Sequence, residues 1–293
     1  LGLRLCAIGW ALHCPPLVLF SLITVGAASN ELGGAGGPLA VLVISVIAAE
    51  LGKMVSKETK IDILITPFVT IFSGCMLAAW WAPGIGAAAS SVGRLIMWAT
   101  NLQPFFMGIL VSVLVGAALT LPISSAAICA ALGLTGLAGG AAVAGCCAQM
   151  VGFAVMSFRE NKWGGLISQG IGTSMLQMGN IVRNPLIWIP PTLASAITGP
   201  IATCIFGLQM NGAAVSSGMG TCGLVGQIGI YTGWISPSEE AIANGAAAIV
   251  PGAREWLALV LISFVLPAVL SFVFCEVLRK IGWIRENDLK LDS

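Results

Sequence analysis

The sequence predicts an all-α polytopic membrane protein with about eight to ten transmembrane helices, and with broken helices or re-entrant hairpins in its C-terminal half. Residues 95–158 contain no Asp, Glu, Lys or Arg, and neither do residues 184–238. A membrane helix needs about 20 apolar residues, so each run is long enough to cross a bilayer at least twice. The composition agrees, because 9% of the residues are charged and the mean hydropathy is +0.98, whereas a soluble domain has about 25% charged residues.

Apolar stretches separated by short polar segments predict five spans in the first half of the chain. Residues 84–101 interrupt this series, because they include Arg94 and Trp98, which are residue types typical of membrane interfaces. We expect this segment to lie at the interface. The predicted spans are 5–28, 38–55, 62–82, 103–121 and 126–157.

The stretch at 126–157 is too long for one crossing. Gly139, Gly140 and Gly145 lie in its middle, so we expect a broken helix or two segments there. After a charged hinge at 159–162, the chain is rich in Gly, Pro and amide residues up to residue 252. A clean apolar span follows at 254–278, and a charged tail follows that span.

Lys and Arg near the span ends predict the orientation, because basic loops stay on the cytoplasmic side. Basic residues crowd the loop after the second predicted span and the C-terminal tail. We therefore expect both termini to be cytoplasmic, which requires an even number of crossings. The basic residues are Arg4, Lys53, Lys57, Lys60, Arg279, Lys280, Arg285 and Lys290.

Composition also narrows the classes of ligand. The nine cysteines contain no CxxC pair and lie mostly in apolar runs, so we expect small buried side chains and neither a disulfide framework nor a metal site. The net charge of +1 suggests no nucleic-acid partner. Nothing in the sequence predicts a cofactor.

The most informative segment is GLISQGIGTSMLQMGNIVRNP, residues 165–185. It is too rich in glycine and polar residues for an ordinary span. Its motif GIGTS at 170–174 is repeated as GMGTC at 218–222, and a glutamine follows each motif, at Gln177 and at Gln227. We expect two broken helices or hairpins around one site.

Broken helices leave backbone N–H and C=O groups unpaired, and transporters build ligand sites from them. Amide side chains both donate and accept hydrogen bonds, which suits an uncharged polyhydroxylated solute. The alternative is that these glycines and amides only join helices to one another. The candidate binding residues are Gln149, Gln169, Thr173, Ser174, Gln177, Asn180, Asn184, Thr221 and Gln227.

The segment NPLIWIPPTLASAITGP (184–200), preceded by a glycine-rich polar segment, resembles the membrane IIC component of sugar phosphotransferase systems. SKETKIDILITPFVTIFSG (56–74) and AGCCAQMVGFAVMSFRENKWGGLISQGIGTSMLQ (144–177) are closer still to the stand-alone IIC-like group that includes regulators of perfringolysin O production. The resemblance covers nearly the whole chain.

This resemblance implies a homodimer in the bacterial cytoplasmic membrane that binds a sugar. It also implies three regions. Residues 1–158 would form the scaffold and dimer interface, residues 159–253 the transport or ligand-binding region with re-entrant hairpins, and residues 254–293 the last span and a cytoplasmic tail.

The chain departs from familiar IIC proteins in its hairpin, where they carry a glutamate that binds a sugar hydroxyl. Gln177 is the nearest polar equivalent here, and a glutamine cannot take a proton from a hydroxyl, which argues against base-assisted phosphoryl transfer. The sequence contains no IIA-like or IIB-like segment, so we expect any phosphate donor to be a separate protein. His13, beside Pro15, is expected to have a helix-kink or packing role rather than to carry a phosphoryl group.

Three functions remain in view. The leading hypothesis is a IIC-like permease for a small polar solute, for which we expect a sugar, that works by alternating access. The second is transport coupled to phosphorylation by a separate IIB protein, with this chain as a membrane subunit and no enzyme on its own. The third is a membrane sensor that binds a solute and regulates gene expression through a partner.

Overall fold

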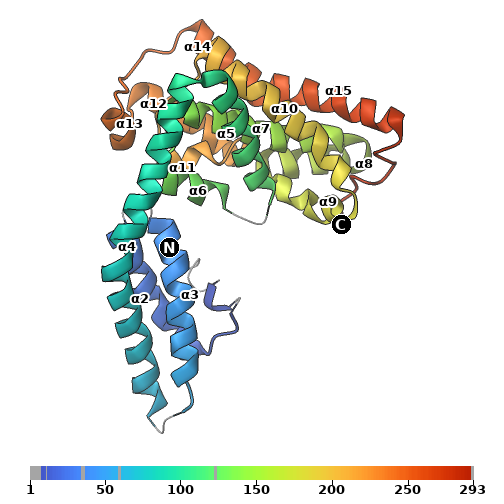
Figure 1. Cartoon of the computed structure of the whole chain (residues 1–293). Coiled ribbons are helices and arrows are strands. Elements are labelled where there is room, and N and C mark those ends of the chain that lie inside the picture. The colour runs from blue at the N-terminus through green and yellow to red at the C-terminus, as the bar shows by residue number, and fades with distance from the viewer. Residues whose placement is uncertain (1–7, 11, 34–36, 59–60, 122–123, 292–293) are drawn as a thin grey trace. The chain divides into compact units, whose positions relative to one another are not determined.

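A computed structural model of the chain describes residues 8–10, 12–33, 37–58, 61–121 and 124–291 (Figure 1). Every regular element in these ranges is helical, so the predicted all-α fold is confirmed. In the first half, the helices are α2 (Pro16–Gly33), α3 (Gly37–Val55), α4 (Asp62–Leu102), α5 (Pro104–Thr120), α6 (Ser125–Leu132) and α7 (Gly136–Met156).

The second half contains short helices whose type changes repeatedly. Its first part comprises α8 (Phe158–Ile167), η2 (Ser168–Gly172), η3 (Ser174–Gln177), α9 (Met178–Arg183), η4 (Pro185–Trp188), α10 (Ile189–Pro200) and η5 (Ile201–Phe206). Its second part comprises α11 (Ala214–Ser217), η6 (Cys222–Leu224), α12 (Val225–Ile235), α13 (Glu239–Ala243), α14 (Ala253–Val260), η7 (Leu261–Val265) and α15 (Leu266–Ile281).

Five segments within the described ranges are long and apolar enough to cross a membrane, and α5 is a shorter apolar helix. The fold is therefore that of an integral, polytopic membrane protein. The five segments are Pro16–Gly33, Asp62–Ala88, Gly136–Met156, Pro185–Phe206 and Ala253–Ile281.

The chain forms two compact units, of which unit 1 comprises residues 1–94 and 130–132. In its described part, α2 and α3 pack along each other. The core that they form with α4 combines branched side chains with small ones, such as Leu22, Ile44 and Ala78, all fully buried. Small residues let helix backbones approach closely where lipid gives no hydrophobic driving force for association.

One expectation for this region is wrong, and another stays a prediction. The predicted span 5–28 is not one helix, because His13 adopts a positive φ of 53° in a turn before α2. The helix α4 runs without a break from Asp62 to Leu102 and includes Pro83. A helix of 41 residues is about 60 Å long, which exceeds the bilayer's hydrocarbon core of about 30 Å. The segment of α4 that is long and apolar enough to cross a membrane ends at Ala88, so the interfacial position of residues 84–101 remains a prediction.

Unit 2 comprises residues 95–129 and 133–293. Its central element is α7, which is buried along almost its whole length and packs against α5, α10 and α15 (Figure 1). The helices α5 and α10 also pack against each other. Because side chains on every face of α7 meet protein rather than lipid, polar groups on this helix must find partners inside unit 2.

The predicted break within 126–157 exists, but it lies earlier than expected. The chain turns between α6 and α7, where Gly133 and Gly136 have φ values of 60° and 61°. Gly140 and Gly145 instead lie inside α7, where an added Cβ would collide with the backbone carbonyls of Leu208 and Ser112. These glycines permit close backbone approach and do not break the helix.

The region from Ser168 to Trp188 passes from a π-helical turn to a 3-10 turn, a short α-helix and another 3-10 turn. The second glycine motif is also irregular, because Gly220, Gly223 and Leu224 have positive φ. Both segments are therefore broken helices, as the glycine pattern predicts. Their re-entrance and the division of roles at residues 158 and 253 remain predictions.

Candidate functional site

The predicted binding residues fall into separate groups around α7. We define the inner cluster as Thr120, Gln149, Ser174, Trp188 and Thr192, and the amide row as Gln169, Gln177, Asn180 and Asn184. Ser174 and Gln177 belong to the same 3-10 turn, so the two groups adjoin. Thr221 and Gln227 form a third group, which contacts α7 at Met150 and Cys147.

The inner cluster is centred on the side chain of Gln149, which is fully buried. Its Oε1 accepts hydrogen bonds from Trp188 Nε1 at 3.0 Å and from Thr120 Oγ1 at 3.2 Å, and its Nε2 donates to Thr192 Oγ1 at 3.2 Å. The hydroxyls of Thr120 and Ser174 lie 2.9 Å apart. The elements α5, α7, α10, η3 and η4 thus converge on one neutral cluster of donors and acceptors.

The amide row is a chain of hydrogen bonds between side chains. Asn180 Nδ2 donates to Gln177 Oε1 at 2.8 Å, Gln177 Nε2 donates to Gln169 Oε1 at 2.9 Å, and Gln169 Nε2 donates to Ser157 Oγ at 2.8 Å. Gln169 and Gln177 are fully buried. Gln169 lies in η2, Gln177 in η3 and Asn180 in α9, so the row follows the irregular turns after α8.

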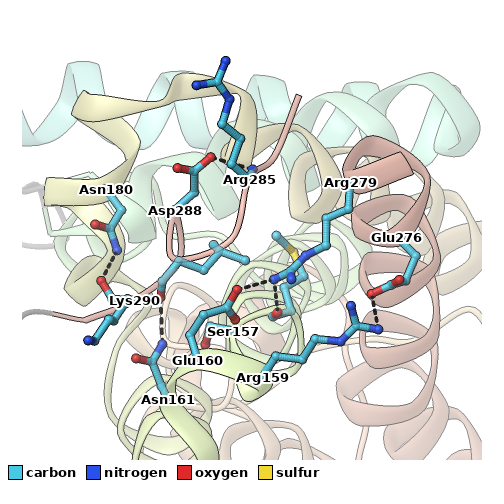
Figure 2. Close-up of polar contacts among 12 residues, drawn as sticks. Ser157, Arg159, Glu160, Asn161, Asn180, Glu276, Arg279, Arg285, Asp288 and Lys290 are labelled. Carbon is cyan, nitrogen blue, oxygen red and sulfur yellow. Dashed lines mark hydrogen bonds and ion pairs between the residues drawn. The ribbon is translucent and has the colours of Figure 1, made fainter. Parts of the chain in front are cut away.

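The C-terminal tail, residues 282–291, lies along this row (Figure 2). The carbonyl of Leu289 accepts from Gln177 Nε2 at 3.0 Å and from Asn161 Nδ2 at 2.7 Å. The Lys290 carbonyl accepts from Asn180 Nδ2 at 2.8 Å, and Leu291 N donates to Asn161 Oδ1 at 2.9 Å. The amides therefore bind main-chain atoms of the tail.

Asn184 contacts the same tail at Trp283 and Asp288. Its Nδ2 donates to the Trp283 carbonyl at 3.1 Å and to Asp288 Oδ2 at 2.8 Å, while its Oδ1 accepts from Leu186 N at 3.2 Å. The last bond caps η4, which begins at Pro185. Asn184 thus fixes both the start of the proline-rich segment and the position of the tail.

Thr221 and Gln227 approach other side chains of α7. Thr221 Oγ1 donates to the Gly170 carbonyl at 2.6 Å, which joins the two glycine motifs directly. Gln227 Nε2 donates to Cys147 Sγ at 3.3 Å, and Gln227 Oε1 is buried without a hydrogen-bond partner among the described residues. Cys147 and Gln149 are two residues apart, or about 200° around a helix, so Gln227 does not join the inner cluster.

Thr173 has a local role in the structure. Its Oγ1 accepts from Met175 N at 3.1 Å and caps the 3-10 turn that contains Ser174 and Gln177. An oxygen at this position satisfies a backbone N–H that has no partner inside the turn. Thr173 therefore shapes the turn that carries binding candidates, rather than facing Gln149.

Two ion pairs lie beside the tail (Figure 2). Arg279 Nη2 bonds Glu160 Oε1 at 2.7 Å and also donates to the Met156 carbonyl at 3.3 Å. Arg159 Nη2 lies 3.0 Å from Glu276 Oε1. Both pairs connect α8 to α15, from which the tail emerges.

Sequence reasoning missed several members of these groups. Thr120 lies in a predicted span, Trp188 and Thr192 lie at variable positions of the proline-rich segment 184–200, and Asn161 lies in the hinge at 159–162. A polar residue inside a predicted span was the available signal for Thr120. No local pattern indicates the docking of the tail. No group of three His, Cys, Asp or Glu residues suited to a metal is found in the part of the chain that the structure describes.

Comparison with protein families decides the wider identity of the chain. The family model described as "Phosphotransferase system, EIIC" matches residues 5–291. The chain belongs to the phosphotransferase-system EIIC family. As an EIIC protein, it is a membrane transporter component of the phosphotransferase system, a class that handles sugar-like solutes and usually works with IIA and IIB partners. The search of curated proteins found no match to this EIIC chain, and neither did the search of solved structures.

Proposed function

We propose that this EIIC protein is a permease for a small, uncharged, polyhydroxylated solute, of which a sugar is the leading example, and that it works by alternating access. The observation that carries the proposal is the inner cluster. A fully buried glutamine is held there by two threonines and a tryptophan from other elements, inside a stretch of chain without charged residues.

The chemistry of the two groups supports an uncharged ligand. The inner cluster presents amide, hydroxyl and indole groups, which together donate and accept hydrogen bonds without net charge. The amide row continues this neutral surface from the shared 3-10 turn. Each hydroxyl of a sugar can replace one of the internal hydrogen bonds, so entry of a solute exchanges existing polar contacts rather than creating unpaired groups.

In this proposal, Gln149 and Ser174 bind the solute directly, and the amide row of Gln169, Gln177, Asn180 and Asn184 extends the site. Thr173 shapes the turn. Thr221 and Gln227 hold the second broken segment against α7 and against the first glycine motif.

The test is ligand-induced stabilisation of the purified full-length protein in detergent. The panel contains neutral hexoses, pentitols, disaccharides, sugar phosphates, nucleosides and organic acids. A ligand at a hundredfold excess over its Kd stabilises the folded state by about 2.7 kcal/mol. We expect a neutral sugar to give the largest shift, and Gln149→Ala to weaken its binding about fivefold or more, since one net hydrogen bond contributes about 1 kcal/mol.

The matched control is Gln103→Ala, because Gln103 is exposed and its side chain does not cap α5. A shift retained in Gln103→Ala and reduced in Gln149→Ala supports the site. The absence of any sugar shift, or equal binding by the two variants, contradicts it. Binding without uptake into vesicles would favour the sensor alternative.

Coupling to phosphorylation by a separate IIB protein is the second candidate, because family membership favours it. Against it, the hydrogen bonds of Gln149 lead only to neutral groups, and a glutamine cannot act as a base. The test is the product of uptake. Sugar phosphate that depends on phosphoenolpyruvate supports coupling, and free sugar contradicts it.

We further propose that the protein is a homodimer in the cytoplasmic membrane, with both termini on the cytoplasmic side. The basic tail and the lysine-rich loop before α4 support this orientation. Labelling of a cysteine at exposed Glu286 by an impermeant maleimide tests the side of the tail. Labelling from the outside of intact cells would contradict the proposal.

A further inference from the structure

We infer that the amide row is a binding site for peptide backbone, that its resident occupant is the protein's own C-terminal tail, and that tail and solute exclude each other. The inference rests on the proposed function and adds regulation to it. The tail must leave before Gln177, Asn180 and Asn184 can bind a sugar.

The inference depends on how many N–H donors of Gln177, Asn180 and Asn184 bind the tail. A primary amide has two N–H donors, so three amides have six. Gln177 gives one to Gln169 and one to the Leu289 carbonyl. Asn180 gives one to Gln177 and one to the Lys290 carbonyl. Asn184 gives both to the tail, at Trp283 and Asp288. All six donors are in use, and four of them bind the tail.

Asn161 also holds the tail (Figure 2). Its Nδ2 donates to the Leu289 carbonyl and its Oδ1 accepts from Leu291 N, so one side chain binds both a C=O and an N–H of the tail. Main-chain hydrogen bonds of this kind bind a peptide through its backbone. Asn161 belongs to neither the amide row nor the inner cluster.

An apolar anchor adds to these bonds. The side chain of Leu289 is fully buried in a cluster that includes Phe153, Ile187 and Leu278, whereas its neighbour Lys290 is exposed. Ile284, also in the tail, is buried in the same cluster, so two apolar side chains anchor the tail. Burial of one leucine contributes about 1.5–3 kcal/mol, enough to keep the tail docked for most of the time.

The tail also has a hinge residue, Gly282. Gly282 ends α15 in the left-handed region, with φ of 85°, and an added Cβ there would meet no atom within 4 Å. In the last turn of α15, the ion pair of Arg279 with Glu160 fixes the end of this helix to α8. The segment that leaves is therefore short, and it begins at a glycine next to a firmly held helix end.

Binding that requires a minor open state has an apparent Kd equal to the intrinsic Kd divided by the open fraction. Loosening the tail should therefore tighten solute binding. Asn161→Ala removes two tail contacts and no contact of the inner cluster, so we expect its apparent Kd for the best neutral sugar of the panel to fall about fivefold or more. Leu289→Ala tests the same effect through the apolar anchor.

The control is Glu286→Ala, on an exposed residue of the same tail. Its Kd should equal that of the unaltered protein. A lower Kd in both Asn161→Ala and Leu289→Ala supports exclusion. Sugar binding by the unaltered protein that is unchanged or weaker in both variants overturns the inference and leaves the proposed function standing, whereas no sugar binding in any of these proteins overturns both.

A second readout follows the tail itself in the full-length protein. Leu289→Cys is labelled with a maleimide, and the labelling of the native cysteines is subtracted with the unaltered protein. We expect slow labelling that rises severalfold with saturating sugar, and rises equally when Asn161→Ala is added without sugar. A labelling rate that neither change affects would show that the tail does not leave, and would overturn the inference.

Discussion

Arg279 and Glu160 form a buried ion pair at the base of the tail, with Nη2 and Oε1 2.7 Å apart and side chains 12% and 6% exposed. The pair joins the last turn of α15 to the first turn of α8. The neighbouring pair of Arg159 with Glu276 joins the same helices, but its side chains are 59% and 27% exposed. Two pairs between the same helices therefore differ mainly in burial.

The first prediction compares these two pairs. Arg279→Ala leaves Glu160 buried without its counter-ion and should destabilise the fold by about 3–5 kcal/mol. Arg159→Ala, the matched control, removes an exposed partner and should cost about 0–1 kcal/mol. Chemical denaturation in detergent measures both. Equal losses would show that burial does not set the strength of these pairs.

The second prediction concerns the glycines inside α7. Gly145→Ala places a methyl group against the backbone of Ser112 on α5, so the two helices must separate. We expect a loss of about 1–3 kcal/mol, the usual cost of overpacking. Gly164→Ala in α8 meets no atom within 4 Å and should not destabilise the protein. The melting temperatures of the two variants test this prediction. Similar values would contradict close packing of α7 against α5.

The third prediction separates strain from crowding. Gly136 begins α7 with φ of 61° and has no atom within 4 Å of an added Cβ. Gly136→Ala should therefore cost about 1–2 kcal/mol through the left-handed backbone alone. Gly179→Ala has equally free space and no positive φ. If Gly136→Ala melts at the same temperature as Gly179→Ala, the turn between α6 and α7 is not constrained as described.

The fourth prediction tests how Gln149 is oriented. Trp188→Phe keeps an aromatic ring but removes the Nε1 donor to Gln149 Oε1. We expect sugar binding to weaken about fivefold with little change in stability, because one net hydrogen bond contributes about 1 kcal/mol. Trp163→Phe, at a ring that is 68% exposed, is the control. Unchanged affinity for the sugar in Trp188→Phe would show that the indole N–H does not contribute to binding.

The helices could be predicted because their cause is local. Runs without charge must satisfy their backbone internally in a membrane, and a helix does this within one segment. The predicted spans at 38–55 and 103–121 therefore agree closely with α3 and α5, and the span at 254–278 lies within Ala253–Ile281. The position of the break before α7 was wrong because glycine has two uses. Gly133 supplies a positive φ, whereas Gly145 supplies space for Ser112, and the sequence does not distinguish them.

The candidate site was predictable in composition but not in arrangement. Amides in apolar and glycine-rich segments could be picked out by residue type, and Gln149, Gln169 and Gln177 are all fully buried. The grouping of Gln149 with Thr120 and Trp188, and the separation of Gln227, depend on which face of α7 each neighbour meets. That choice is made by helix packing between segments distant in the sequence.

The sequence by itself determined that this protein folds in a lipid bilayer, that its backbone is helical and that it has a neutral polar region. These properties follow from composition and from the need of each stretch of chain to satisfy its backbone hydrogen bonds. Only the tertiary structure decided what the amides touch. Asn161 and Leu289 are 128 residues apart. Their contact exists because two ion pairs join α8 to α15 and because Leu289 packs in an apolar cluster with side chains of α7 and α15. No local periodicity encodes such a contact, since its free energy comes from surfaces that meet only after the helices have packed.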